Sequence, residues 1–205
     1  MGSAALLLAA GGSRRFATGG EGGEATHKLL ADWHSEPVVR HCARTLVDAG
    51  IGRILAVAGA RGAEVERALA PLGIESVRND GWADGMGGSL ALGVATLVGD
   101  GAPDAILVAL ADMPLLRAAD HAHVLGAHDR DDPMAVTRGA VGGRPGHPVV
   151  FGKGWFARLA ALSGDEGAGS LLRGHAVRLV GLDAETQRDV DTPEALAAAR
   201  DVGRR

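Results

Sequence analysis

Apolar residues along the chain form short continuous runs, and the segments between these runs have their apolar positions at helical spacing. The runs predict strands at residues 3–10, 52–59, 74–79, 104–114, 134–139, 147–152 and 176–182. The periodic segments predict helices over 37–50, 63–73, 87–99, 117–129, 155–164, 167–175 and 192–202. Apolar strands that alternate with helices predict an α/β protein with a mostly parallel sheet covered on both faces.

The composition is that of an ordinary globular protein. The 205 residues are 46% hydrophobic and 22% charged, which argues against disorder and against a coiled coil. No internal repeat interrupts the pattern, and no linker is long enough to divide it. We therefore expect one domain over residues 1–205.

Charge and aromatic content limit the partners. The net charge is −4, and aromatic residues make up 3% of the chain with no tyrosine. We therefore expect no nucleic-acid partner and no membrane surface. The first apolar run is too short to span a bilayer and has no basic residues before it, which favours a soluble, unprocessed, cytoplasmic protein.

Cysteine and histidine usage gives little sign of metal or redox chemistry. Cys42 is the single cysteine and lies in a predicted helix, where a buried structural thiol is expected. His121, His123 and His128 resemble a metal cluster superficially. Without a partner cysteine we do not favour a metal role for them.

Glycines and arginines directly follow the first predicted strand, at Gly11, Gly12, Ser13, Arg14 and Arg15. Glycines let backbone N–H groups approach an anion closely, and arginines add charge and a planar set of donors. The spacing matches neither the P-loop nor the G-x-G-x-x-G motif. A phosphate site and a tight turn without a ligand both remain open from these residues alone.

Carboxylates lie at one further predicted strand end and in the segment before the last predicted helix. Asp112 follows the strand at 104–114, where it is suited to hold Mg²⁺ against phosphate oxygens, to cap a helix or to lie in a solvated turn. Near the C-terminus, Asp189 and Asp191 alternate in an extended segment and point in opposite directions. Thr192 is suited to cap the last helix, with Pro193 in its first turn.

Two glycine-containing segments complete the candidate chemistry. In GMGGSL, we expect Gly85, Gly87, Gly88 and Ser89 to precede a helix, with free N–H groups directed at the site or with Ser89 capping the helix. In the segment 142–152, Arg144 and His147 are expected in a turn before a strand.

These pieces, in this order, resemble the MobA-like family of nucleotidyltransferases, and within it the molybdenum cofactor cytidylyltransferase type. The stretches that carry the resemblance are LAAGGSRRF, HKLLADW, VRNDGWADGMGGSL, LADMP, GRPGHPVVF, GDEGAGSLL and DVDTPEAL. The resemblance implies a Rossmann-like three-layer α/β/α fold. It also implies transfer of a nucleoside monophosphate from an NTP to a phosphate-bearing acceptor with release of pyrophosphate.

The resemblance implies roles for particular residues. Arg15, Lys28 and Asp112 would be catalytic, with Arg15 and Lys28 on the triphosphate. Mg²⁺ would be held by Asp112 and Asp191, with Asp189 as a neighbour. The acceptor would meet Arg144, His147, Gly164 and Asp165. The nucleotide would contact Leu8, Ala9, Ala10, Gly11, Gly12, Ser13, Arg14, Arg15, Lys28, Gly87, Gly88, Ser89, Leu90 and Asp112.

The implied substrates are CTP and the molybdenum cofactor, and the implied protein partner is a molybdoenzyme or its chaperone. The chain departs from the family pattern in a longer segment between Arg15 and Lys28, and in Gly169, where the family often has arginine. A guanylyltransferase and a non-catalytic nucleotide-binding partner of a molybdoenzyme are the alternatives. An NAD(P)-dependent Rossmann enzyme is disfavoured by the glycine spacing of the first turn.

Overall fold

A seven-stranded sheet forms the centre of the computed structural model, which describes residues 2–13, 16 and 27–202. The strands are β1 (Ala4–Ala9), β4 (Arg53–Ala58), β5 (Glu75–Arg78), β6 (Ala105–Leu110), β7 (Val136–Val141), β8 (Arg144–Gly152) and β9 (Arg178–Gly181). Their order across the sheet is β5-β4-β1-β6-β8-β7-β9. A short hairpin of β2 (Asp32–Trp33) and β3 (Glu36–Pro37) lies apart from this sheet.

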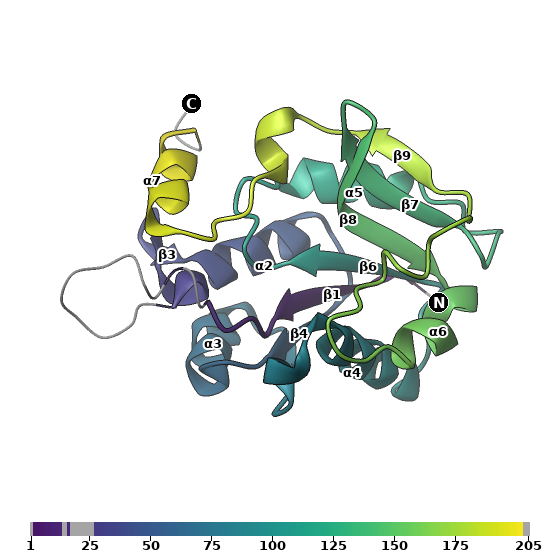
Figure 1. Cartoon of the computed structure of the whole chain (residues 1–205), viewed down its shortest axis with the longest axis horizontal. Helices are drawn as coiled ribbons and strands as arrows, with labels where there is room; N and C mark the ends of the chain where they lie inside the picture. The colour runs from purple at the N-terminus through teal and green to yellow at the C-terminus, as the bar shows by residue number, and fades with distance from the viewer. Residues whose placement is uncertain (1, 14–15, 17–26, 203–205) are drawn as a thin grey trace.

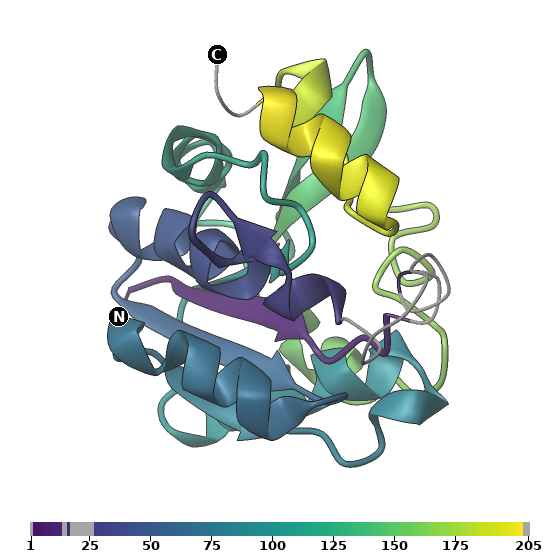
Figure 2. The ribbon, with the colours of Figure 1, turned by 90° about the vertical axis from the view of Figure 1, so that its left-hand side faces the viewer.

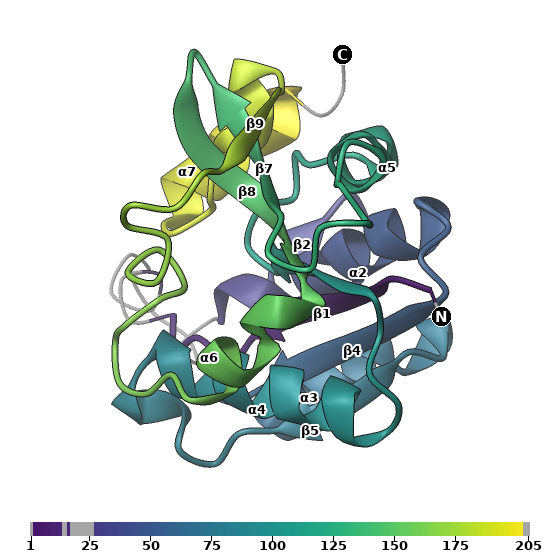
Figure 3. The same ribbon diagram turned by 90° about the vertical axis from the view of Figure 1, so that its right-hand side faces the viewer.

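The sheet is mostly parallel, as the apolar pattern predicts. β5, β4, β1 and β6 run in one direction, and β8 alone reverses between β6 and β7. β9 pairs in parallel with β7 at the far edge. The sheet twists, so that β7, β8 and β9 rise away from β1 and β4 (Figure 3).

Helices cover both faces (Figure 1), which confirms the predicted three-layer arrangement. The helices are α2 (Val38–Asp48), α3 (Gly62–Leu69), α4 (Met86–Gly99), α5 (Ala118–Gly126), α6 (Phe156–Ala160) and α7 (Pro193–Val202). Alternate residues of β1 point to opposite faces of the sheet. Leu7 joins the core under α2, α3, α5 and α7, whereas Leu6 joins the core under α4 and α6.

Short 3-10 turns complete the described chain at η1 (Lys28–Leu30), η2 (Ala70–Leu72), η3 (Trp82–Asp84), η4 (Lys153–Trp155) and η5 (Ala184–Gln187). Some predicted elements are wrong. Residues 167–175 form turns and not a helix, because three glycines interrupt the segment and Gly174 has a φ of +78°. The strand predicted at 104–114 ends at Leu110. None of the helices in the described residues has the length and apolarity needed to cross a membrane.

The chain changes direction in the sheet between β1 and β6. From β1 it builds outward through β4 and β5, and it then crosses to the other side of β1 to form β6. The loops after β1 and β6 therefore leave the sheet in opposite directions, which opens a crevice at the carboxyl ends of the strands. Figure 2 looks at this edge of the molecule.

The first turn of α4 packs closely against residues 163–166. A Cβ atom on Gly87 would lie 2.7 Å from the carbonyl oxygens of Ser163 and Glu166. A Cβ atom on Gly88, one residue later in the same turn, would meet only the Asn79 amide at 3.9 Å. The two neighbouring glycines thus differ in the space around them.

We expect Gly87→Ala to lower the free energy of unfolding by about 1–3 kcal/mol, because backbone oxygens must move to admit the methyl group. Gly88→Ala is the matched control, and it should leave stability unchanged or raise it by up to about 1 kcal/mol because alanine favours the helix. Urea unfolding of both variants measures the difference. Equal stability of the two variants would contradict the packing argument.

Candidate active site

A lysine and two aspartates meet at the carboxyl edge of the sheet. The Lys28 Nζ atom lies 2.5 Å from Oδ2 of Asp112 and 2.6 Å from Oδ1 of Asp191. The three side chains are only 12%, 20% and 33% exposed, respectively. Residues distant in the sequence are therefore joined in one partly buried charge cluster.

The backbone fixes both aspartates. The N–H of Ala111 donates to the Leu8 carbonyl, which continues the pairing of β1 and β6 as far as Asp112. The N–H of Val190 donates to the Asp112 carbonyl at 2.9 Å, and the Val190 side chain is fully buried. The segment before α7 is thus pinned beside the end of β6.

The cap of α7 holds Asp191 from its other side. Thr192 Oγ1 accepts a hydrogen bond from the Ala195 N–H at 3.1 Å, and α7 begins at Pro193. The capping prediction for Thr192 is confirmed. The Asp191 carboxylate accepts a hydrogen bond from Lys28, whereas Asp189, which precedes Val190 in the chain, is exposed.

The electrostatics of the cluster favour a cation between the carboxylates. Burial lowers the pKa of Lys28, but the charges and hydrogen bonds of Asp112 and Asp191 outweigh this effect and raise that pKa above its usual value. Two carboxylate oxygens directed at one positive centre are also the hard donors that Mg²⁺ prefers.

The donor set therefore fits a divalent ion at the position of the Lys28 ammonium. Among the residues that the structure describes, no group of three or more His, Cys, Asp or Glu side chains is arranged to hold a metal. A metal on Asp112 and Asp191 would thus take its remaining ligands from water and substrate oxygens, as Mg²⁺ commonly does.

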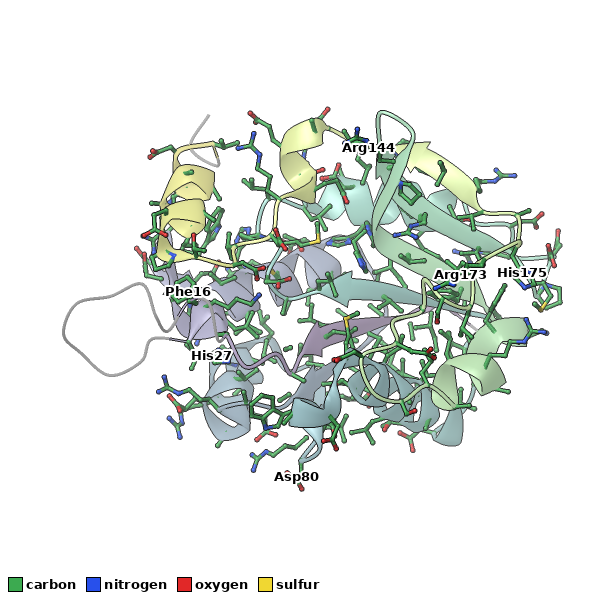
Figure 4. The ribbon with its side chains drawn as sticks, viewed as in Figure 1. Phe16, His27, Asp80, Arg144, Arg173 and His175 are labelled. Atoms are coloured by element: carbon green, nitrogen blue, oxygen red, sulfur yellow. The ribbon has the colours of Figure 1, made fainter. Side chains whose placement is uncertain are left out.

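The loop after β1 approaches this cluster. Ser13 Oγ accepts the backbone N–H of Lys28 at 3.2 Å, and the His27 ring bonds to the Gly11 carbonyl through Nε2 at 2.9 Å. His27 lies at this point in Figure 4. A Cβ on Gly11 would meet no described atom within 4 Å, so the space beside its Cα is open to a ligand. Arg14 and Arg15 lie outside the described residues.

A cleft of about 400 Å³ opens beside the cluster, which is within the usual range for small-molecule sites. Trp82 covers Gly12, because a Cβ there would lie 2.6 Å from the indole ring. The cleft is lined by Leu8, Ala10, Gly11, Gly12, Ser13, Trp82, Ala83, Gly85, Met86, Ser89, Leu110, Asp112 and Asp165. Segments from across the chain thus share one cavity.

The start of α4 differs from the sequence expectation. The helix begins at Met86, so Gly87, Gly88 and Ser89 lie within its first turn. Ser89 does not cap the helix; its hydroxyl accepts the Asn79 side-chain amide at 2.9 Å. The Gly87 N–H donates to the Gly164 carbonyl, so it is not free for a ligand.

A second, smaller cavity of about 100 Å³ adjoins the cleft. The two cavities share Leu8, Met86 and Leu110. Apart from two side chains, Arg138 and His147, the lining of the small cavity is apolar or glycine: Leu8, Met86, Leu90, Val108, Leu110, Val149, Phe151, Gly167, Ala168, Gly169 and Leu172. Leu90 thus contacts this cavity and not the larger cleft.

His147 is held by a side chain from near the C-terminus. The Gln187 amide donates to the His147 carbonyl at 2.6 Å and accepts its N–H at 2.8 Å. Burial and the charge of Arg138 lower the pKa of His147 to about 4. Its imidazole is therefore neutral at physiological pH.

Arg144 and His147 have different surroundings in the structure. Both residues belong to β8, so the expectation that they lie in a turn is wrong; Gly142 and Gly143, both with positive φ, form the turn between β7 and β8. Arg144 is exposed at the end of this hairpin, away from the cleft (Figure 4). Of the other acceptor candidates, Gly164 bonds to the start of α4 and Asp165 lines the cleft.

The cysteine and two of the histidines considered in the sequence analysis make structural contacts. Cys42 is buried, as expected, and burial raises the pKa of its thiol. His121 contacts Thr45, and His128 contacts Thr137.

Sequence reasoning assigned no role to Trp82, Arg138 or Gln187. Trp82 lies within a stretch that carries the family resemblance, but a single arginine in an apolar strand and a single glutamine in a polar segment give no comparable signal.

The arrangement agrees with comparisons to known proteins. The model of the MobA-like NTP transferase domain matches residues 5–180. No match is found among curated protein sequences.

Solved structures share the fold. A nucleotidyl transferase from Methanothermobacter superposes with a TM-score of 0.83 at 23% identity, over 98% of this chain and 96% of that one. Rv0371c from Mycobacterium tuberculosis, in complex with manganese, gives 0.78 at 22% identity, over 98% and 99%. CMP:2-keto-3-deoxy-manno-octonic acid synthetase, complexed with CTP, gives 0.74 at 16% identity, over 100% and 99%.

The family match covers most of the chain, and the fold and the crevice at the carboxyl edge of the sheet agree with it. The protein therefore belongs to the family of MobA-like NTP transferase domains and is a nucleotidyltransferase.

Proposed function

We propose that this nucleotidyltransferase moves CMP from CTP onto a phosphate-bearing acceptor of the molybdenum cofactor type and releases pyrophosphate. The observation that carries the proposal is the convergence of Lys28, Asp112 and Asp191 beside the larger cleft. The choice of CTP is supported by the LAAG and RPGHP stretches and by the CTP complex of a protein with the same fold.

The reaction needs no nucleophile from the protein. An oxygen of the acceptor phosphate is already anionic, and it attacks the α-phosphorus of the nucleotide. The bond between the α-phosphorus and the bridging oxygen to the β-phosphate then breaks, and pyrophosphate leaves. The protein contributes positioning and the neutralisation of charge.

The residues of the site divide this work. Gly11, with open space beside its Cα, and the indole of Trp82 border the cleft in which the nucleotide would lie. Lys28 would donate to triphosphate oxygens. Asp112 and Asp191 would hold Mg²⁺, which polarises phosphoryl oxygens when bound. The manganese complex of Rv0371c supports a divalent ion in this fold.

The first experiment measures pyrophosphate release from CTP, GTP, ATP and UTP with Mg²⁺, with and without molybdenum cofactor. We expect release with CTP that depends on the acceptor. Release with GTP would move the assignment to a guanylyltransferase. Binding of CTP without release under any condition would contradict the catalytic proposal and favour a non-catalytic nucleotide-binding protein.

We expect Asp112→Asn to lower transfer by about a hundredfold or more, because it removes a charged ligand at the reacting phosphates without changing the shape of the side chain. Asp201→Asn, on the exposed side of α7, is the matched control and should retain activity. Thermal unfolding would verify that both variants are folded. Full activity of a folded Asp112→Asn variant would contradict the metal role.

We expect Lys28→Met to have opposite effects on metal binding and on transfer. The loss of the ammonium removes a cation that competes with the metal for Asp112 and Asp191, so Mn²⁺ affinity should rise by about tenfold, whereas transfer should fall. Paramagnetic resonance of free Mn²⁺ measures the affinity without any turnover. Lys153→Met, at an exposed position, is the control. Unchanged Mn²⁺ affinity in Lys28→Met would show that the metal does not use these two carboxylates.

A further inference from the structure

Arg138 differs from other arginines in the described part of the chain. Six arginines near the surface pair with carboxylates: Arg44, Arg53, Arg61, Arg78, Arg117 and Arg200. Arg138 is half-buried on β7, and no described carboxylate lies within 4.0 Å of it. Its Nε atom donates to the Gly146 carbonyl at 3.0 Å, which leaves the two terminal nitrogens of the guanidinium without a hydrogen-bond partner among the described residues.

A guanidinium in this position is costly without an anion. Arginine stays charged at physiological pH, and burying a charge without a counterion is unfavourable. Burial is the cause that lowers the pKa of Arg138, and no nearby carboxylate opposes it. A charged group that is partly buried in a cavity without a counterion is a candidate for ligand binding.

The cavity beside Arg138 has the size of a subsite. Its volume of about 100 Å³ is well below the 300–1,000 Å³ that is typical of a whole ligand site, so it has room for one end of a molecule. It opens beside the nucleotide cleft, with which it shares Leu8, Met86 and Leu110. A group bound there would therefore adjoin the nucleotide.

His147 adds a second polar group to the same cavity. Its Nδ1 atom is buried and has no hydrogen-bond partner among the described residues. The ring is neutral at physiological pH and has a single N–H, which a hydrogen bond to the Val108 backbone uses, so Nδ1 is left to accept a hydrogen bond from a ligand hydroxyl. The rest of the wall is apolar or glycine, which is suited to contact a carbon skeleton.

We infer that Arg138 forms a subsite for an oxyanion of the acceptor, a phosphate or a carboxylate, with His147 Nδ1 accepting from a neighbouring hydroxyl and the apolar wall against the adjoining carbon atoms. The inference rests on the proposed function, since the acceptor must lie beside the nucleotide. Arg138 would offset the repulsion between the acceptor anion and the triphosphate. It replaces Arg144, which is exposed at the end of the β7–β8 hairpin, as the cation for the acceptor.

The test is direct binding of inorganic phosphate, with acetate as the carboxylate probe. Each anion is titrated by calorimetry into protein whose nucleotide cleft is filled with α,β-methylene CTP, and again without nucleotide. We expect the wild-type protein to bind at least one of the two anions. The stronger of them identifies the class of the acceptor group. Absence of binding for both anions would overturn the inference.

Arg138→Gln should weaken anion binding by about tenfold or more, because a charge-assisted contact is lost. Arg144→Gln is the matched control, with affinity expected within about twofold of the wild type. Equal binding by the wild type and Arg138→Gln would overturn the inference. An equal loss in Arg144→Gln would place the anion at the hairpin and would overturn it as well.

A second pair of variants avoids disturbing the contact between Arg138 and Gly146. Gly169 lines the cavity, and a Cβ there would meet nothing within 4 Å. Gly169→Glu should place a carboxylate near Arg138 and weaken anion binding by about tenfold, whereas the neutral Gly169→Gln should weaken it much less. Equal affinities in these two variants would contradict a charge-dependent site.

The outcomes separate the subsite from the proposed function. Anion binding that depends on Arg138 in a protein that binds no nucleotide would refute the proposed function and leave the anion site standing. If the protein transfers nucleotide but its anion binding is unchanged by Arg138→Gln and by Gly169→Glu, the subsite alone is refuted.

Discussion

The candidate active site depends on the contact of one ammonium group with two carboxylates. Asp112 and Asp191 come from segments that the chain brings together only in the folded state, and partly buried carboxylates repel at short range. A cation between them offsets that repulsion, and Lys28 provides one in the protein itself. The two carboxylates are thus held close together by an internal positive charge.

The position of this cluster follows from the topology of the sheet. β1 and β6 are adjacent parallel strands whose following loops diverge, so the sheet opens at the place where Asp112 emerges. Close backbone packing forms the walls of the opening. Gly87 allows residues 163–166 to approach α4, and Gly12 allows Trp82 to cover the loop after β1. The glycines near the site therefore allow chain segments to pack closely, and they do not only leave space for a ligand.

The sequence predicts the sheet and its layers well, because alternating apolar runs and amphipathic segments have few other ways to bury their surfaces. The same reasoning places Asp112 at the end of a strand. It fails where tertiary contacts decide: Ser89 bonds to Asn79 instead of capping α4, and residues 167–175 stay in turns. It also favours Arg144 over Arg138, because only the folded hairpin shows which arginine reaches a cavity.

The distribution of positive charge fits a reaction between two anions. Lys28 lies at the carboxylate cluster beside the larger cleft, and Arg138 lies in the adjoining cavity, where His147 remains uncharged. A single cluster of cations would bind either reactant and discriminate poorly between them. Two separated cations, one paired with acidic side chains and one surrounded by apolar groups, give each anion a different environment. This asymmetry gives a physical reason why a nucleotide and its acceptor would occupy adjacent sites without exchanging places.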